Sequence, residues 1–241
     1  MRFGVCCNPD RAKAVLEAGF DYVEAPALAV ATGVVPRGTE VTNLFVFTDL
    51  KLVGPEKGDI GEYGRDLIPK AAQLGVQVMV IGSGGARRAP EGYSVEKATE
   101  EFLEAIQTMH SIAQPLGVTV APESLRREET NVGNDLGVLA GELAARGCAF
   151  TADSYHVLAQ QGGKKPTAAF WKKEVPFAPA HVHLATRERT WRVAEDPALI
   201  PFVARLRDLG YDGRVSLEVR WDDFEGELTS AREQIVRLFS S

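Results

Sequence analysis

The sequence has few of the features that mark secreted, membrane-spanning or nucleic-acid-binding proteins. It contains three cysteines, Cys6, Cys7 and Cys148, too few for the dense disulfide framework of a small secreted protein. No apolar run approaches the ~20 residues that a membrane span needs. Its 27 lysines and arginines are outnumbered by 33 aspartates and glutamates, and the net charge of −6 argues against a nucleic-acid or anionic-membrane surface.

The chain also lacks a signal-peptide core and an obvious linker. The stretch Met1–Val5 has no apolar h-region, and we expect a cytoplasmic protein whose cysteines are buried, reduced thiols. Two segments punctuated by Gly and Pro, Ala27–Thr39 and Asp49–Gly61, are expected to be loops rather than domain boundaries. Residues 1–241 are therefore predicted to form a single domain.

A helix-like segment that ends at Gly, followed by a short apolar run, recurs along the chain. Gly75 and Gly117 mark two of these junctions, where a residue without Cβ suits the left-handed helix cap. The short β-branched runs are typical of parallel strands buried on both faces. The predicted strands are Arg2–Cys6, Tyr22–Ala25, Asn43–Phe47, Gln77–Ile81, Thr119–Glu123, Phe150–Asp153, Ala180–Leu184 and Val215–Glu218.

The segments between these strands predict helices. The clearest is Ser94–Gln114, which begins at a capping serine and carries an apolar face. The sixth helix is poorly defined because Gln160–Pro166 is polar and rich in helix breakers. Eight strands alternating with helices over this length predict a (β/α)8 TIM barrel, with a doubly wound open sheet as the alternative. The other predicted helices are Arg11–Ala18, Tyr63–Leu74, Leu136–Ala145, Pro197–Leu209 and Phe224–Phe239.

Metal-ligating side chains end the last four predicted strands. Active sites of such barrels lie at the carboxyl ends of the strands, so we expect these side chains to meet. A mixed set of carboxylates and an imidazole suits one divalent ion such as Mn²⁺, Co²⁺, Zn²⁺ or Mg²⁺. The predicted ligands are Glu123, Asp153, His183 and Glu218.

The remaining histidines and the polar residues of earlier strands are not assigned to the ligand set. His181 and His183 face the same side of their strand, and His183 lies nearer its carboxyl end, so His181 is expected in the core. Glu24 and Asn43 lie at the ends of earlier strands. Each side chain could equally contact a substrate or form a structural hydrogen bond. His110 lies late in a predicted helix and is expected at its surface.

Together these motifs resemble the xylose isomerase-like (β/α)8 family, and in particular its sugar phosphate isomerase/epimerase branch, which includes the ketose 3-epimerases. The resemblance extends over nearly the whole chain. Glu123–Glu129 is similar to the family's Glu-x-x-Asn-Arg-aromatic-Glu, and Asp153–His156 is similar to its Asp-x-x-His. His181–Leu184, followed by Arg189, is similar to its His-x-His-Leu and later Arg. Glu218 corresponds to the family's glutamate on the eighth strand.

The chain departs from the family's pattern in two places. Arg126 and Glu128 replace the family's Asn and aromatic residue, and the segment Ala185–Arg192 lacks its Pro-Gly. The loops that cover the substrate are therefore expected to differ from those of the family.

The resemblance implies a metal-dependent sugar isomerase or epimerase that acts on a keto-sugar or sugar phosphate. Its four metal ligands would be the predicted set, and Glu123 and Glu218 would be base and acid on opposite faces of the substrate carbon. Glu129, His156 and Arg189 would hold substrate oxygens. Proton transfer beside a ketone through an enediolate gives epimerisation or aldose–ketose isomerisation. The implied partner is a small sugar, and a homo-oligomer is left open.

Three other functions remain open at this point. A dehydratase or lyase acting on a keto-sugar or an inosose would use the same residues, and a barrel that binds a sugar or metal without catalysis would not need the paired glutamates. The related abasic-site endonucleases use three metals and histidines from early strands, whereas this chain has no histidine before His110. The loop Gly82–Arg88 could form either a phosphate-binding cradle or a tight turn. Trp191 and Trp221 could pack either on the face of a bound sugar or on the rim of the barrel.

Overall fold

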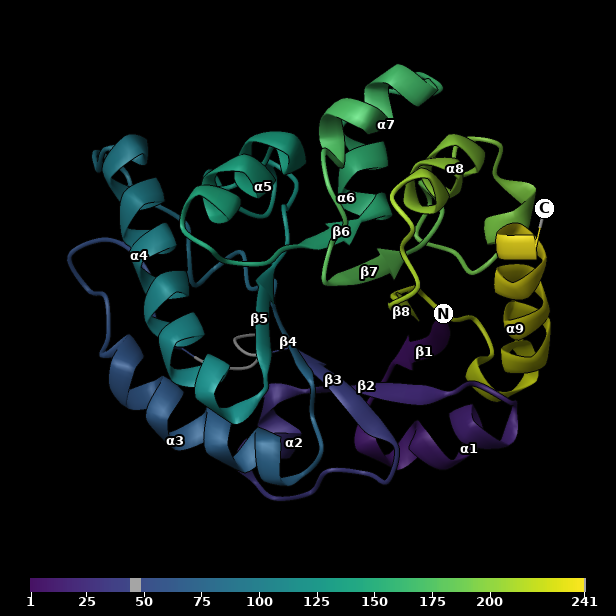
Figure 1. Ribbon diagram of the computed structural model, residues 1–241, viewed down its shortest axis with the longest axis horizontal. Helices are drawn as coiled ribbons and strands as arrows, with labels where there is room; N and C mark the ends of the chain where they lie inside the picture. Colours follow the sequence, from purple (N-terminus) through teal and green to yellow (C-terminus); the bar gives the residue numbers. More distant parts are fainter. Residues whose placement is uncertain (44–48, 241) are drawn as a thin grey trace.

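A computed structural model describes residues 1–43 and 49–240, and the strands in these ranges form one barrel (Figure 1). All neighbours are parallel, in the order β5-β4-β3-β2-β1-β8-β7-β6. Between β5 and β6 the ring is closed by an isolated parallel bridge from Glu123 to Thr151. The strands are β1 Arg2–Cys6, β2 Tyr22–Pro26, β3 Thr39–Asn43, β4 Val78–Ile81, β5 Thr119–Pro122, β6 Thr151–Asp153, β7 His181–Leu184 and β8 Arg214–Leu217.

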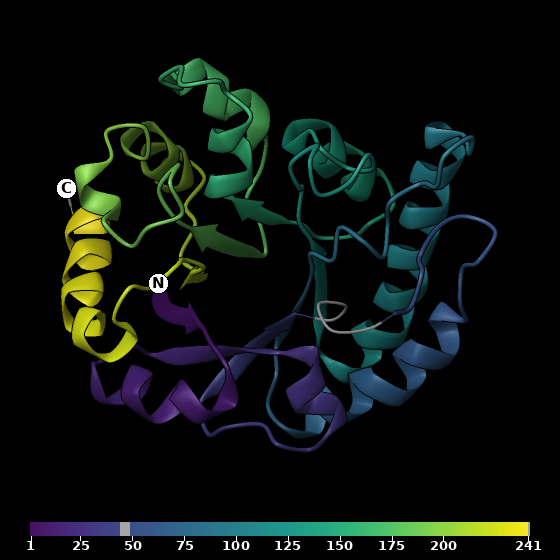
Figure 2. The same cartoon turned by 180° about the vertical axis from the view of Figure 1, so that it is seen from behind.

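The helices surround the strands on the outside of the ring (Figures 1 and 2). This arrangement confirms the predicted TIM barrel and rules out the doubly wound open sheet. Short 3-10 turns at Pro9–Arg11, Gln114–Leu116 and Val193–Glu195 join some elements. The helices are α1 Ala12–Glu17, α2 Ala27–Ala31, α3 Ile60–Gln73, α4 Val95–Ala113, α5 Leu136–Ala145, α6 Ser154–Ala159, α7 Ala168–Glu174, α8 Ile200–Asp208 and α9 Phe224–Ser240.

Most predicted strands agree with the structure to within two residues, but the third begins four residues earlier than predicted. Asn43–Phe47 was predicted, whereas β3 is Thr39–Asn43, and residues 44–47 lie outside the described residues. Val41 of β3 is fully buried inside the barrel against Tyr22 and Val78. Burial in the closed barrel therefore decides where this strand begins.

Helices differ from the prediction in two regions. The predicted loop Ala27–Thr39 begins with the short helix α2, and the uncertain sixth helix is two helices, α6 and α7, that flank the breaker-rich segment. The predicted cap of the longest helix is confirmed, because the Ser94 hydroxyl accepts a hydrogen bond of 3.1 Å from the Lys97 amide. Within residues 1–43 and 49–240, the helices are all too short or too polar to span a membrane.

Two apolar cores support the polar residues at the carboxyl ends of the strands. The larger lies between the strands and the helices, and the smaller lies inside the barrel around Tyr22. The Tyr22 hydroxyl and the Ser216 hydroxyl are 2.9 Å apart, so they tie β2 to β8. Gly4 of β1 lies against the Tyr22 ring, which leaves no room for a side chain there.

Gly4→Ala is expected to lower the free energy of unfolding by about 1–3 kcal/mol, because the added methyl group overlaps the Tyr22 ring inside a packed core. Gly141→Ala is the matched control. Gly141 lies on α5 with open space at its Cβ position, so the substitution is expected to be neutral or to stabilise by roughly 0.5–1 kcal/mol. Urea denaturation measures both, and equal stability of the two variants would contradict this account of the inner core.

Candidate functional site

Four side chains from the last four strands converge at the carboxyl end of the barrel. Candidate ligand atoms of Glu123, Asp153, His183 and Glu218 all lie within 4.8 Å of one another. His183 Nδ1 is 3.0 Å from a Glu123 oxygen, 3.2 Å from a Glu218 oxygen and 3.5 Å from Asp153 Oδ2. The structure thus brings together all four residues of the predicted ligand set, which we call the carboxylate cluster.

The donor set of the carboxylate cluster fits a divalent cation. Asp153 Oδ1 accepts a hydrogen bond of 2.9 Å from the His156 amide and so caps α6. Its other oxygen, Oδ2, is buried and has no hydrogen-bond partner in the described part of the chain. A buried oxygen with an open acceptor site beside two further carboxylates and an imidazole is suited to a metal ion, whose identity this mixed set leaves open.

The electrostatics of the cluster also favour positive charge. Burial alone would lower the pKa of His183, but the charges of Glu24 and Glu123 outweigh it and hold the pKa well above its ordinary value. Burial raises the pKa of Glu123, and the neighbouring Glu218 and Asp153 add to the increase although His183 opposes it. Burial acts against ionisation of Asp153, yet His156 and His183 keep its pKa below the usual range.

Glu24 completes the site from the other side of the His183 ring. Its Oε1 accepts hydrogen bonds of 2.9 Å from His183 Nε2 and 2.6 Å from Asn43 Nδ2, and its Oε2 lies 3.0 Å from His181 Nε2. When the ring is neutral and Nε2–H donates to Glu24, the lone pair of Nδ1 faces the carboxylate cluster. His181 is fully buried, pairs with Glu24 and packs edge-on against the His183 ring, with 5.0 Å between the ring centroids.

Sequence reasoning left the role of Glu24 open, although a signal was present. Glu24 lies two residues after the inward-facing Tyr22 on β2 and therefore faces the same interior. The ligands on the last four strands were selected because they lie near the carboxyl ends of those strands, and the same reasoning applies to Glu24 on β2.

The three residues expected to hold substrate oxygens lie beside the cluster. His156 Nδ1 is 3.1 Å from a Glu129 oxygen, and Arg189 is 2.5 Å from Glu218. Burial opposes the charged form of His156, but Asp153 and Glu129 raise its pKa to about 9. Burial likewise opposes ionisation of Glu129, whose pKa is nevertheless lowered to about 2 by His156 and Arg126. Arg126, a departure from the family pattern, is 2.8 Å from Glu129.

A cavity of about 610 Å³ opens onto the cluster. Glu123, Glu218 and the three expected substrate-holding residues line it, as do Gly82–Gly85 and Trp221. Trp191 is buried in the outer core instead. A ligand in the cavity would therefore meet both glutamates of the cluster.

The glycine-rich loop after β4 supports Glu123. Arg87 is fully buried and donates a hydrogen bond of 2.7 Å to the Glu123 carbonyl, so it holds the backbone at the end of β5. Gly82 lies directly against the Glu123 carboxylate, where a Cβ would collide with Oε1. The loop thus fixes the position of one cluster member.

Comparison with known proteins agrees with this architecture. Residues 12–239 match the family model described as xylose isomerase-like TIM barrel. The chain belongs to this family. The resemblance inferred from the strand-end motifs is therefore confirmed at the level of the family.

Several solved structures of similar fold are sugar epimerases at low sequence identity. D-psicose 3-epimerase from Clostridium cellulolyticum H10, with D-tagatose, has a TM-score of 0.77 and 15% identity, with 99% of each chain covered. L-ribulose 3-epimerase has a TM-score of 0.79 and 14% identity, with 99% of this chain and 94% of that chain covered. 3-keto-D-glucoside 4-epimerase from E. coli has a TM-score of 0.74 and 15% identity, with 100% of both chains covered. A search of curated protein sequences finds no significant match.

Gly82→Ala is expected to weaken the affinity for Mn²⁺ at least ~10-fold, because a methyl group at this position displaces the Glu123 carboxylate from His183. Gly85→Ala is the control, since the Cβ position of Gly85 in the same loop is open. Calorimetric titration of Mn²⁺ into both folded variants checks the prediction. Equal affinities would show that Glu123 is not held in place by this loop.

Proposed function

We propose that this xylose isomerase-like barrel is a divalent-metal-dependent isomerase or epimerase of a keto-sugar or sugar phosphate. The observation that carries the proposal is the placement of two glutamates, Glu123 and Glu218, beside the same His183 nitrogen and on the wall of the same cavity. Proton removal and return at one carbon require two such groups at one site.

Glu123, Asp153, His183 and Glu218 would hold the ion. When bound, a divalent cation supplies positive charge that stabilises the enediolate formed beside a ketone. This proposal follows from the donor set and from the open acceptor site at Asp153 Oδ2.

The two glutamates differ in their surroundings, which suits different roles in proton transfer. Glu123 is almost completely buried, with 5% of its side chain exposed, and burial raises its pKa. Glu218 is more exposed, at 23% of its side chain, and pairs with Arg189. They directly follow β5 and β8, which two other strands separate in the barrel, so they approach the cavity from different directions.

The cations and hydrogen-bonding groups on the wall suit the oxygens of a sugar. His156 and Arg189 can donate to hydroxyl or carbonyl oxygens, and Glu129 can accept from a hydroxyl. Each is already held by an ionic neighbour, so it is oriented before a substrate arrives.

The same fold also occurs in a solved structure of an AP endonuclease, family 2, from Brucella melitensis, with a TM-score of 0.74 and 16% identity. The ends of β1, β2 and β3 in this chain present Cys6, Glu24 and Asn43 rather than histidines, and the net charge is −6. These features favour a sugar over a nucleic acid as the ligand.

Asp153→Asn is expected to weaken Mn²⁺ binding at least ~10-fold, since it removes a carboxylate of the cluster. Asp135→Asn is a matched control because Asp135 caps α5 in the same way, accepting 2.9 Å from the Val138 amide, but lies outside the cluster. Elemental analysis after reconstitution and desalting should give about one ion per wild-type chain. Unchanged binding by the Asp153 variant would refute the ligand assignment, and about three ions per chain would support the endonuclease.

Substrate and reaction are tested together by exchange of sugar protons in D2O. Wild-type protein with Mn²⁺ is expected to introduce deuterium beside the carbonyl of a keto-sugar such as D-fructose, D-tagatose or L-ribulose, the sugars named with three structural neighbours. Glu123→Gln and Glu218→Gln are each expected to slow the exchange at least ~100-fold.

Glu225→Gln, on the exposed start of α9, is the control for this exchange. Full exchange by either cluster variant would exclude the paired-glutamate mechanism. A product lighter by one water would instead assign the chain as a dehydratase that uses the same residues.

A further inference from the structure

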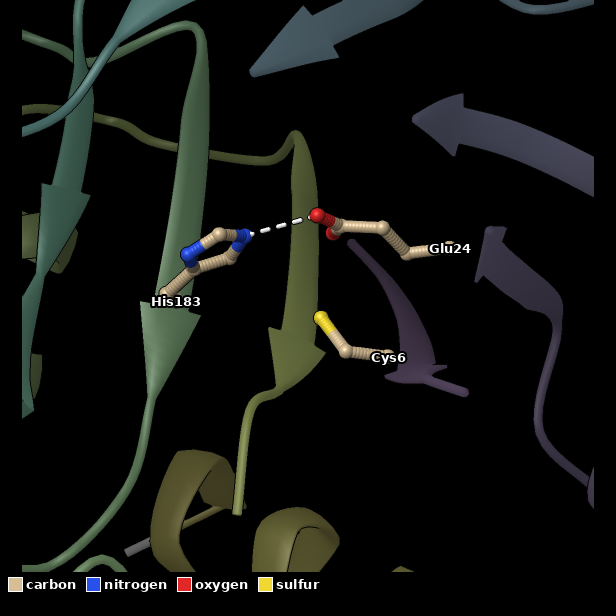
Figure 3. Close-up of side chains that lie close together, drawn as sticks. All are labelled: Cys6, Glu24 and His183. Atoms are coloured by element: carbon tan, nitrogen blue, oxygen red, sulfur yellow. Dashed lines mark hydrogen bonds and ion pairs between the residues drawn. The ribbon is translucent and has the colours of Figure 1, made fainter. Parts of the chain in front are cut away.

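A second group of metal-ligating side chains lies on the opposite side of the His183 ring. Cys6 ends β1, Glu24 lies on β2 and His183 lies on β7, and one ligand atom of each lies within 4.8 Å of the others. Figure 3 shows the Cys6 sulfur and the Glu24 carboxylate directed toward the same side of the imidazole. The contact between His183 and Glu24 there is the 2.9 Å hydrogen bond from Nε2.

The donors of this group differ in kind from those of the carboxylate cluster. Sulfur, imidazole nitrogen and one carboxylate oxygen form a set that prefers Zn²⁺, Cd²⁺ or Co²⁺ to Mg²⁺ or Mn²⁺. Three protein ligands leave one position of a tetrahedral ion open. The carboxylate cluster, with three carboxylates and one imidazole, accepts harder ions.

The group is shielded and yet reachable. Glu24 and His183 are each 1% exposed, so their donor atoms are almost free of competing water. Cys6 is a free thiol, and both Cys6 and Glu24 line the 610 Å³ cavity, so an ion can enter from the side that a substrate would use.

We propose that Cys6, Glu24 and His183 Nε2 form a second metal site, which binds thiophilic divalent ions. We call it the thiolate site. It goes beyond the proposed function, with which it shares only His183. A neutral imidazole coordinates through one nitrogen and keeps its proton on the other. An ion at Nε2 therefore leaves a protonated Nδ1 facing the carboxylate cluster, which loses one of its four ligands, and the two sites compete for one ring.

Cd²⁺ titration followed by ultraviolet difference absorption tests the thiolate site, because a cadmium–thiolate bond gives a charge-transfer band that carboxylate ligands do not give. The wild-type chain is expected to show this band, and Cys6→Ser is expected to lose it. Cys7→Ser is a closely matched control, since Cys7 is the next residue and lines the same cavity but lies outside the group. A band that persists in Cys6→Ser, or that disappears in Cys7→Ser, would overturn the proposal.

Competition with Mn²⁺, followed by electron paramagnetic resonance, tests the sharing of His183. Adding Cd²⁺ to the Mn²⁺-loaded wild type is expected to release Mn²⁺, and Cys6→Ser should need at least tenfold more Cd²⁺ for the same release. Equal displacement curves for the two proteins would overturn the competition.

Asp153→Asn separates this proposal from the proposed function. It is expected to keep the Cd²⁺ band while losing Mn²⁺, because Asp153 belongs only to the carboxylate cluster. A wild type that shows the band but binds none of Mn²⁺, Co²⁺ and Mg²⁺ at the carboxylate cluster would refute the metal-dependent isomerase and leave the thiolate site standing. A wild type that binds Mn²⁺ without showing the band would do the reverse.

Discussion

The burial of several carboxylates around one imidazole is the constraint on which the rest of the site depends. Glu24, Glu123 and Asp153 are each 1–3% exposed, and each lies within 3.5 Å of a His183 nitrogen. Removing this much negative charge from water is costly unless positive charge accompanies it. His156 and Arg189 supply part of that charge, and the raised pKa of His183 supplies more. The buried carboxylates and the imidazole together therefore could hold a cation.

The surrounding fold holds the carboxylates where they would otherwise move apart. One oxygen of Asp153 accepts the hydrogen bond that caps α6, and this contact leaves the other oxygen oriented into the cluster. Arg87 holds the Glu123 carbonyl, and Gly82 leaves the space that the Glu123 carboxylate occupies. Each of these contacts restricts the conformations of a carboxylate. Without them, repulsion between the neighbouring carboxylates would favour positions farther apart. Such pre-organisation lowers the cost of assembling a binding site.

How far the sequence predicts this arrangement depends on the range of the interactions. The strand-end rule found Glu123, Asp153, His183 and Glu218 because parallel strands in a closed barrel end at one rim. Alternation along β7 places His181 and His183 on the same side, and His183 was chosen because it lies nearer the carboxyl end of the strand. The role of Glu24 was left open: its place on β2 directs it into the barrel, but its partners are two histidines that lie more than 150 residues later. The start of β3 was predicted four residues too late, because Val41 becomes buried only when the barrel closes.

The ring of His183 joins two halves of the barrel that sequence motifs treat as separate. The β5–β8 half presents carboxylate oxygens to Nδ1, whereas the β1–β2 half presents sulfur and a carboxylate to Nε2. Glu24 is itself fixed by Asn43 and His181, so its hydrogen bond to Nε2 favours the tautomer that serves the carboxylate cluster. A ligand that competes for Nε2 must displace this bond. Because sulfur binds soft ions and carboxylates bind hard ones, the choice of ion at one ring determines which half of the barrel can act.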